Sequence, residues 1–400
     1  MEPYWARILS LLLSVLLHLH GCCYADTWAA MPVHGTGKLQ PEDGICAALV
    51  TPYGYSCEEH TVTTTDGYIL SVYRILHGVN GNSQSLGSPV FLQHGLCGAG
   101  YQWLENSPQE SLGFVLADEG FDVWVGNTRG TRWSSGHIQL SVNDKAYWNW
   151  TVDELMSYDL QAMLGLVHST TGQKSYYIGH SQGSLIALGA LAQGTITELV
   201  ASLVLFAPVA YLNQSKSFFA KAGADLYFEK LFSIAGITEF NPTSGIGADF
   251  MDFVCARSDS LCKAFWGPNC CMNMTRVPFY LQFDPQPTST KNIMHFSQLI
   301  RTGTFQKYDY GTSGNMVEYL QPYPPTYELS SISTEISLFI LHGGLDQLAD
   351  ANDVQRLIGD LKCKVKTTFV ESYGHSDFIV GMHAYEDVYQ DVVSFLKSSN

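Results

Sequence analysis

Residues 179–183 read Gly-His-Ser-Gln-Gly and place Ser181 between two glycines. The apolar run 175–178 before this pentapeptide predicts a strand, and leucines at helical spacing over 185–192 predict a helix after it. A serine hydroxyl is exposed on so sharp a strand-to-helix turn, and the flanking glycines remove Cβ atoms that would clash there. The context therefore predicts that Ser181 is a nucleophile.

The two partners that such a serine needs, a carboxylate and a histidine, follow later in the chain. The apolar run 336–341 predicts a buried strand, and the Gly-Gly-Leu-Asp loop behind it ends at Asp346. The run 365–370 predicts the last strand, and the loop after it contains His375. In this arrangement His375 takes the serine proton, while Asp346 orients the ring and stabilises the imidazolium. The order serine, acid, histidine is that of the α/β-hydrolase fold.

Asp346 has alternatives, because an aspartate beside two glycines often only forms a turn. Asp350 and Asp353 are the nearby rivals, and Asp350 is expected instead to cap a helix that starts near residue 351. The chain has 13 histidines, and His375 is the one that lies in the loop after the last predicted strand. Packing or hydrogen-bonding roles are expected for His94, His180 and His342. We therefore expect Asp346 and His375 to serve Ser181.

An acyl-transfer site also needs hydrogen-bond donors for the developing oxyanion. The predicted strand 90–93 ends in His94-Gly95-Leu96, and in this fold a backbone N–H from that loop joins the N–H of the residue after the nucleophile. The backbone N–H groups of Leu96 and Gln182 are the predicted donors. His94-Gly95 also turns the chain out of the strand, which is compatible with that role.

Further motifs are spread over the chain from about residue 55 to its end. They are Glu58-Glu59-His60, Asp66-Gly67-Tyr68-Ile69-Leu70, Phe91–Leu96, Asp122–Gly130, Tyr158-Asp159-Leu160, Ala207-Pro208-Val209-Ala210, Tyr308-Asp309-Tyr310-Gly311 and Leu348-Ala349-Asp350. With the serine pentapeptide they resemble the acid lipase family, the group that contains gastric lipase and lysosomal acid lipase. The resemblance implies neutral lipid esters as substrates and carries the family's triad onto Ser181, Asp346 and His375. It also carries the oxyanion donors onto Leu96 and Gln182, and the family's cap disulfide onto Cys255 and Cys262.

The organisation of the chain follows from its length and from the rhythm of its strands and helices. A chain of 400 residues fits one large α/β core with an insertion. A basic residue, a short apolar run and a small-residue site predict a signal peptide over 1–25, with a buried helix or membrane anchor as the alternative. Alternating strands and helices predict a mostly parallel, doubly wound sheet for 26–210 and 336–400. The rhythm breaks over 211–335, which predicts an inserted, largely helical cap.

Individual elements can be predicted within this outline. A hairpin is expected over 61–75, cap helices near 218–232 and 292–301, and core strands at 90–93, 123–125, 176–178, 203–206, 338–341 and 367–370. Cap aromatics could line an apolar tunnel for acyl chains, although most are expected to fill the cap's own interior. They are Phe218, Phe219, Phe228, Phe232, Phe250, Phe253, Phe265 and Trp266.

A signal peptide makes the cysteines informative. Ten are present, of which Cys22 and Cys23 lie in the predicted signal peptide, and in an oxidising route the others are disulfide candidates. Cys46 with Cys57 is a plausible pair, while the remaining connectivity stays open. A zinc site over 255–271 is disfavoured because no paired Cys-x-x-Cys occurs there. Candidate glycosylation sites are Asn149, Asn213 and Asn273. The protein is expected in the secretory pathway, either extracellular or in the lumen of a lysosome or vacuole.

The net charge of −16 and the absence of a basic stripe argue against a nucleic-acid partner. No stretch after the predicted signal peptide is long and apolar enough to span a bilayer. We expect a monomeric serine ester hydrolase that needs no cofactor or metal and acts on neutral lipids or at a lipid–water interface. Triacylglycerols and sterol esters both remain open as substrates. The alternatives are a carboxylesterase for small esters, a lipid acyltransferase and a non-catalytic hydrolase-like protein.

Overall fold

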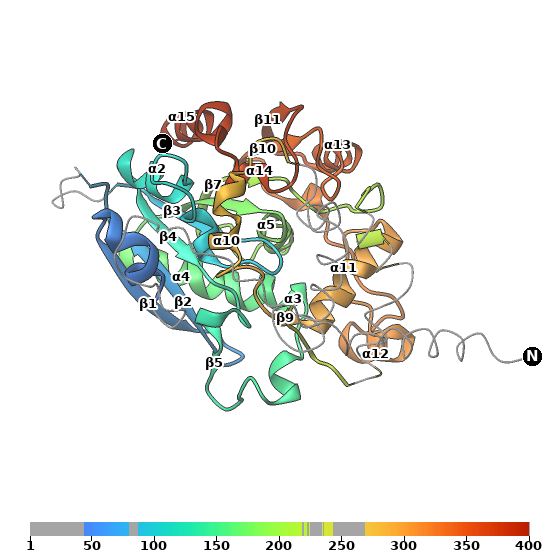
Figure 1. Ribbon diagram of the computed structural model, residues 1–400. Helices are drawn as coiled ribbons and strands as arrows, with labels where there is room; N and C mark the ends of the chain where they lie inside the picture. Colours follow the sequence, from blue (N-terminus) through green and yellow to red (C-terminus); the bar gives the residue numbers. More distant parts are fainter. Residues whose placement is uncertain are drawn as a thin grey trace, which may run out of the picture. The chain divides into compact units, whose positions relative to one another are not determined.

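One sheet of nine strands organises the part of the chain that the structure describes. This computed structural model describes residues 44–79, 87–217, 220–221, 224, 234, 236–242 and 269–399. The strand order is β1-β2-β4-β3-β6-β7-β10-β11, with β5 pairing with β2 (Figure 1). The strands are β1 (Cys57–Thr63), β2 (Tyr68–Ile75), β3 (Pro89–Gln93), β4 (Asp122–Gly126), β5 (Gly136–His137), β6 (Ser175–His180), β7 (Val200–Phe206), β10 (Ser337–Gly343) and β11 (Lys364–Val370). From β4 to β11 every pairing is parallel, which confirms the mostly parallel sheet.

The burial of the strands explains why their sequences differ. All residues of β3, β4 and β6 are buried, because helices cover both faces of a parallel sheet and such strands become continuous apolar runs. Strand β11 lies at the edge of the sheet and alternates in exposure, with Lys364 exposed at its start. Charged side chains on an edge strand discourage pairing with another chain.

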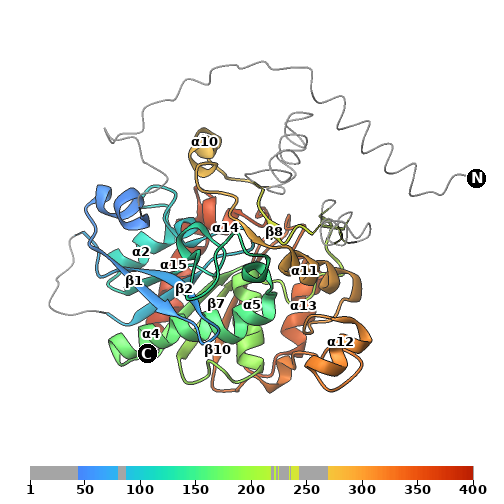
Figure 2. The same cartoon turned by 90° about the horizontal axis from the view of Figure 1, so that it is seen from below.

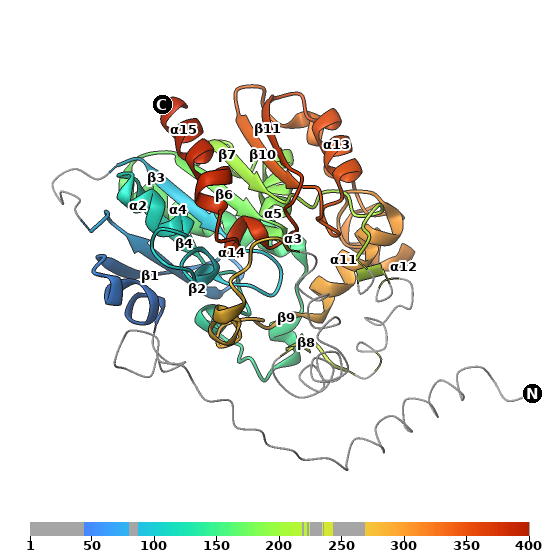
Figure 3. The same ribbon diagram turned by 45° about the horizontal axis from the view of Figure 1, so that its top comes forward.

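The connections put helices on both faces of the sheet. The connection from β3 to β4 runs through α2 and moves along the sheet towards β1. The connections through α4, α5 and α13 move the other way, towards β11. Because such crossovers are right-handed, α2 lies on the face opposite α4, α5 and α13. Helix α15 joins the face of α2, since Lys397 pairs with Glu119 at 2.6 Å, and Figures 2 and 3 show the two helices together. The bounds are α2 (Leu112–Asp118), α3 (Val152–Glu154), η6 (Leu155–Asp159), α4 (Leu160–Thr171), α5 (Gln182–Ala192), α13 (Ala351–Asp360), α14 (Asp377–Val380), η9 (Tyr385–Tyr389) and α15 (Gln390–Ser398).

The segment between β7 and β10 is described in part. It contains β8 (Glu239–Phe240), β9 (Thr288–Ser289), α10 (Val277–Tyr280), α11 (Thr290–Thr302) and α12 (Gly311–Glu318). Helix α11 confirms the helix expected near 292–301; the side chain of Ser289 caps its start, and Gly303 in the left-handed region ends it. Most of the helix expected at 218–232, all eight cap aromatics, Cys255, Cys262 and the signal peptide over 1–25 lie outside the described residues. None of the described helices is long and apolar enough to cross a membrane.

Two sequence-based expectations in the N-terminal part are confirmed. Strands β1 and β2 form the antiparallel hairpin predicted over 61–75, with Gly67 in the left-handed region at its turn. Cys46 and Cys57 form a disulfide that ties the short helix before β1 to the start of that strand. In the described part of the inserted segment, Cys270 and Cys271 form a second disulfide.

A buried ionic network holds the loop after β4 to two other parts of the core. The Arg129 guanidinium donates to Asp159 at 2.7 Å and to both carboxylate oxygens of Asp66, and it stacks 3.8 Å from the centre of the Tyr68 ring. Arg129 and Asp159 are almost completely buried. Because the charges are paired and hydrogen-bonded inside the protein, removal of one partner leaves an uncompensated buried charge.

We expect Arg129→Ala to lower the free energy of unfolding by about 3–5 kcal/mol, because it leaves the buried Asp159 carboxylate without its ion-pair partner. Chemical denaturation of the purified protein measures this loss. The matched control is Glu198→Ala, which removes the exposed ion pair with Lys174 and is expected to leave the denaturation midpoint unchanged. Equal effects of the two substitutions would contradict a structural role for the buried network.

Candidate active site

Ser181 lies on the turn between β6 and α5, as its pentapeptide predicts. Its backbone has a φ of 54°, in the region that a residue with a side chain rarely adopts. The Ser181 N–H donates to the carbonyl oxygen of Phe206 at the end of β7, at 3.0 Å. This bond to the neighbouring strand helps to hold the strained conformation, a kind of strain that concentrates at functional sites.

The glycines on either side of Ser181 are required by close packing. A Cβ on Gly183 would lie 2.5 Å from the carbonyl oxygen of Gln93, and a Cβ on Gly179 would lie 2.7 Å from the backbone of Gly183. Both distances are shorter than real contacts of a Cβ atom. The start of α5 can therefore approach the end of β3 only because Gly183 lacks a side chain. The sharp turn itself is possible only because Gly179 lacks one.

His375 and Asp346 come together although 29 residues separate them in the sequence. Nδ1 of His375 lies 2.8 Å from Oδ2 of Asp346, so the ring donates its Nδ1 proton to the carboxylate. Asp346 follows β10 and His375 follows β11, and these neighbouring parallel strands end at the same edge of the sheet. Nε2 of His375 is left to serve as a proton acceptor.

Asp346 is held in its ionised form. Its other oxygen, Oδ1, accepts hydrogen bonds from the N–H groups of Leu348 and Ala349 at 2.8 and 2.9 Å. Burial by itself raises the pKa of Asp346, but the facing His375 ring and these hydrogen bonds outweigh it and lower that pKa below its usual value. A negative charge is therefore available to stabilise a protonated His375.

The rival carboxylates have other roles, as expected for Asp350. Its side chain caps α13 by accepting from the N–H of Asn352 at 2.9 Å, and it pairs with Lys216 at 2.7 Å. Asp353 accepts from the N–H of Gln214 at 2.9 Å. The hydrogen bond between His375 and Asp346 has no counterpart at Asp350 or Asp353 within the described ranges.

The loop after β3 lies directly against Ser181. A Cβ on Gly95 would lie 3.2 Å from the Cβ of Ser181, so the loop that carries Leu96 runs directly beside Ser181. His94 holds this loop, because its Nε2 accepts from the N–H of Thr128 and its Nδ1 then donates to the carbonyl of Gly95 at 2.8 Å. Burial lowers the pKa of His94 to about 4, which keeps the ring neutral and both bonds intact.

His180 holds the loop of His375 in the same manner. Its Nε2 lies 2.9 Å from the carbonyl oxygen of His375, and since a carbonyl only accepts, Nε2 carries the proton. Burial, followed by the neighbouring His375 ring, lowers the pKa of His180 to about 3. His94 and His180 thus confirm the hydrogen-bonding roles expected of them.

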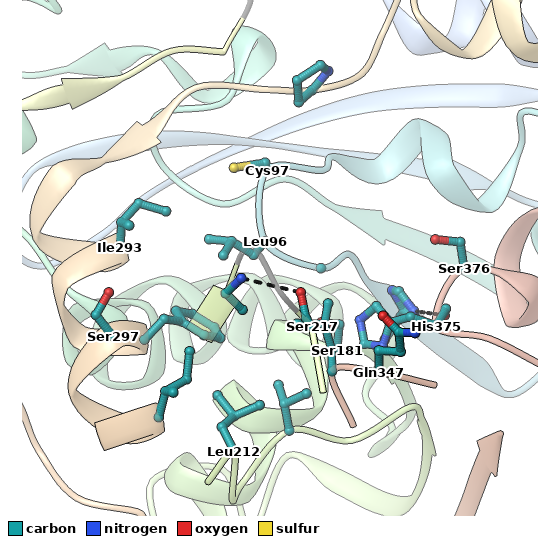
Figure 4. Close-up of a pocket in the computed structure, with 18 of the residues that line it drawn as sticks. Leu96, Cys97, Ser181, Leu212, Ser217, Ile293, Ser297, Gln347, His375 and Ser376 are labelled. Carbon is teal, nitrogen blue, oxygen red and sulfur yellow. Dashed lines mark hydrogen bonds between the residues drawn. The ribbon is translucent and has the colours of Figure 1, made fainter. Parts of the chain in front are cut away.

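A cavity of about 360 Å³ opens onto these residues. Leu96, Ser181 and His375 all line it, and Figure 4 shows their side chains on its wall. Gln182 begins α5 directly behind Ser181, and the N–H of a first helical residue has no acceptor within its helix. The N–H groups of Leu96 and Gln182 therefore remain the candidate oxyanion donors.

One wall of the cavity comes from α11. Ile293, Phe296 and Ile300 line it, at a spacing that puts them on one helical face. Asn292 on the same helix donates from its Nδ2 to the side-chain oxygen of Gln182 at 2.9 Å, and both residues are buried. The apolar wall is thus joined by a hydrogen bond to the residue that follows Ser181.

Sequence reasoning did not find Asn292 or Asp377. The buried Asp377 carboxylate accepts from the N–H groups of Gly374 at 2.7 Å and Cys270 at 3.0 Å, so it fastens the loop of His375 to the segment between β7 and β10. Gly374-His375-Ser376-Asp377 contains a usable signal, an aspartate that can bond back to a loop N–H. The hydrogen bond of Asn292 to Gln182 joins residues 110 positions apart, and no local sequence pattern predicts it.

The three glycosylation candidates differ in exposure. Asn149 and Asn213 are exposed, whereas Asn273 is half-buried and uses its side chain to cap a short helix through the N–H of Thr275. The first two are the more accessible to a modifying enzyme.

Comparisons with known proteins agree with this geometry. Residues 88–382 match the family model described as "alpha/beta hydrolase fold", and residues 46–107 match the "Partial alpha/beta-hydrolase lipase region". Triacylglycerol lipase 2 of Arabidopsis thaliana is 43% identical over 88% of each chain. Gastric triacylglycerol lipase of Bos taurus is 38% identical over 87% of this chain and 90% of its own. Lysosomal acid lipase/cholesteryl ester hydrolase of Macaca fascicularis is 36% identical over 92% of this chain and 96% of its own.

A solved structure shows the same fold at low sequence identity. A soluble variant of monoglyceride lipase from Saccharomyces cerevisiae superimposes with a TM-score of 0.54 and 16% identity, covering 88% of this chain and 99% of its own. The fold is thus shared by two proteins whose sequences are only 16% identical.

We expect Asp346→Asn to lower the rate of ester turnover by several orders of magnitude, because an amide cannot stabilise the imidazolium and favours the wrong tautomer of His375. Asp350→Asn is the matched control and is expected to change turnover little, since Asp350 only caps α13. Steady-state kinetics on a soluble ester separates the two variants. A larger loss from Asp350→Asn would show that the acid has been assigned to the wrong position in the loop.

Proposed function

The chain belongs to the acid lipase family of α/β-hydrolases, and on that premise we propose that it cleaves neutral lipid esters through an acyl-enzyme on Ser181. It is a serine ester hydrolase of the lipase class. The observation that carries the proposed mechanism is the 2.8 Å hydrogen bond between His375 and Asp346, on the wall of the cavity that Ser181 also lines.

In the acylation step His375 Nε2 accepts the hydroxyl proton of Ser181 as Oγ attacks the ester carbonyl. The carbonyl oxygen becomes an oxyanion, and the N–H groups of Leu96 and Gln182 donate to it. Asp346 stabilises the positive ring meanwhile. Collapse of the tetrahedral intermediate breaks the bond to the alcohol, and the alcohol leaves with the proton from His375.

Deacylation repeats these steps with water in place of Ser181. His375 accepts a proton from the water as its oxygen attacks the acyl-enzyme carbonyl, and it then returns that proton to Ser181 Oγ. The fatty acid leaves and the enzyme is restored. Two features suit the residues to this cycle: Asp346 stays ionised, and the carbonyl of His375 is held by His180, so the ring keeps its place.

We assign the acyl chain to the wall of α11. Ile293, Phe296 and Ile300 give this wall an apolar surface, and Ser181 lines the same cavity. On this ground we propose 211–335 as a cap over a core of 26–210 and 336–400. The proposed acyl contacts come from α11, whereas the cap aromatics, most of which were expected to fill the cap's own interior, lie outside the described residues.

We propose as well that the protein works in the secretory pathway, either outside the cell or in a lysosomal or vacuolar lumen. The disulfide of Cys46 with Cys57 is of a kind that persists in oxidising compartments. The signal-peptide pattern over 1–25, the exposed candidates Asn149 and Asn213, and the relatives named gastric and lysosomal support it. The partner is a neutral lipid or its interface with water. A monomer suffices, because one chain supplies every site residue.

We expect a fluorophosphonate probe to label the wild-type protein covalently and to leave Ser181→Ala unlabelled. Loss of one hydroxyl at the elbow should change the melting temperature little, whereas turnover should fall by several orders of magnitude, because triad residues act as a unit. Intact-mass spectrometry and a triacylglycerol assay measure the two effects. Labelling of Ser181→Ala, or retention of more than a few per cent of the activity, would contradict the assignment of the nucleophile.

We expect kcat/KM to rise as the acyl chain lengthens from acetate towards oleate, by up to about 4-fold for each methylene that the cavity buries. Phe296→Asp should abolish this rise and spare acetate esters, because a charge on the apolar wall opposes only a chain that reaches it. Val317→Asp, at a position 81% exposed on α12, is the control and should behave like the wild type. Dispersed esters below their aggregation limit are the substrates. A flat profile in the wild type would favour an esterase for small esters.

A further inference from the structure

A carboxyl group that the proposed mechanism does not use lines the same cavity as Ser181. Asp284 follows α10 and is 4% exposed. No described residue hydrogen-bonds or ion-pairs with its side chain, and its Oδ1 is buried without a partner. A buried polar group without a partner is unfavourable. Because Asp284 lines the cavity, a molecule bound there can lie against its side chain.

The position of Asp284 is set by contacts to the oxyanion loop. Two residues further on, the N–H of Gln286 donates to the carbonyl oxygen of Cys97 at 2.7 Å. Cys97 directly follows Leu96, the candidate oxyanion donor. The side chain of Gln286 accepts from the N–H of Arg132 at 3.0 Å, which fastens the segment to the core. Asp284 thus belongs to a segment that is fastened to the residue after Leu96, and it lines the same cavity as Ser181.

Burial raises the pKa of Asp284 well above that of an ordinary aspartate, which favours the protonated carboxyl. Burial is also the largest of the causes that raise the pKa of the neighbouring Cys97 thiol to about 12. A protonated carboxyl can donate from its O–H and accept at its other oxygen. It is suited to an uncharged polar group of a substrate.

The candidate substrates differ in whether they offer such a group. In any ester the reacting carbonyl oxygen accepts hydrogen bonds from the N–H groups of Leu96 and Gln182 in the proposed mechanism. A triacylglycerol has two further ester groups, each a short distance from the reacting one along the glycerol backbone. A sterol ester has no second polar group, because a hydrocarbon ring system follows its ester oxygen. Only an acylglycerol can therefore satisfy Asp284 while its reacting ester sits at Ser181.

We infer that Asp284 is a specificity-determining residue that hydrogen-bonds a non-reacting ester group of the glycerol backbone, and that it favours acylglycerols over sterol esters. The inference rests on the proposed function and names the substrate class of that same site. A site that hydrogen-bonds a polar group discriminates against analogues that lack the group, because its own polar atoms are then left unpaired.

The test is competition between trioleoylglycerol and cholesteryl oleate in the same mixed micelles, with ethyl oleate as a substrate that has a single ester. Asp284→Leu has a similar shape but neither donates nor accepts. It should lower the ratio of trioleoylglycerol to cholesteryl oleate turnover by about 3- to 10-fold, the range of one neutral hydrogen bond. Asp284→Asn keeps a donor and an acceptor in place and should retain the wild-type ratio. Turnover of ethyl oleate should stay within about 2-fold in both variants.

A change in the substrate gives a second measurement that does not depend on how the variants fold. In 1,2-di-O-alkyl-3-oleoylglycerol, ethers replace the two non-reacting esters and the bulk is kept. The wild type should cleave it about 3- to 10-fold more slowly than trioleoylglycerol at the primary ester, and Asp284→Leu should lose this difference. Equal wild-type rates on the two glycerolipids would overturn the inference, as would an equal effect of Asp284→Leu on all substrates. If the wild type cleaves none of these esters, the proposed function itself fails.

Discussion

The close approach of the β6–α5 turn to the end of β3 is the constraint on which the rest of the site depends. Gly183 packs against the carbonyl of Gln93 at a distance that no side chain would allow. Because β3 and β6 are neighbouring parallel strands, this contact brings Ser181 and the loop of Leu96 to the same end of the sheet. The proposed nucleophile and oxyanion donors are thus positioned by backbone packing, which the chain cannot relax without separating the two strands.

Around that contact the protein controls charge by burial. The His375 ring and hydrogen bonds outweigh the desolvation of Asp346 and lower its pKa, whereas at His94 and His180 burial outweighs the opposing contributions and lowers the pKa to about 4 and about 3. The neutral histidines each keep one nitrogen as a donor to a loop carbonyl, and one loop carries Leu96 while the other carries His375. Histidine thereby serves as a rigid support at two positions, and we propose that it serves as the base at a third.

The segment between β7 and β10 forms part of the cavity wall and also holds neighbouring residues of the core in place. Helix α11 presents the apolar wall of the cavity and, through Asn292, holds the side chain of the residue after Ser181. Asp377 ties the loop of His375 to the same segment through the N–H groups of Cys270 and Cys271. The proposed acyl wall and the proposed catalytic groups therefore share one framework, since the segment between β7 and β10 contacts both the residue after Ser181 and the loop of His375.

The sequence by itself determined the sheet and predicted the triad and the oxyanion loop, because each depends on a local pattern. Ser181 follows a buried strand, Asp346 and His375 lie in the loops after two others, and parallel strands bring such loops to one edge. Strand ends were less well predicted, as in β7, which begins at Val200 rather than near residue 203. Only the tertiary structure decided what surrounds Asn292, Asp377 and Asp284. The hydrogen bonds of Asn292 and Asp377 join residues 110 and 107 positions apart, and burial raises the pKa of Asp284 well above that of an ordinary aspartate.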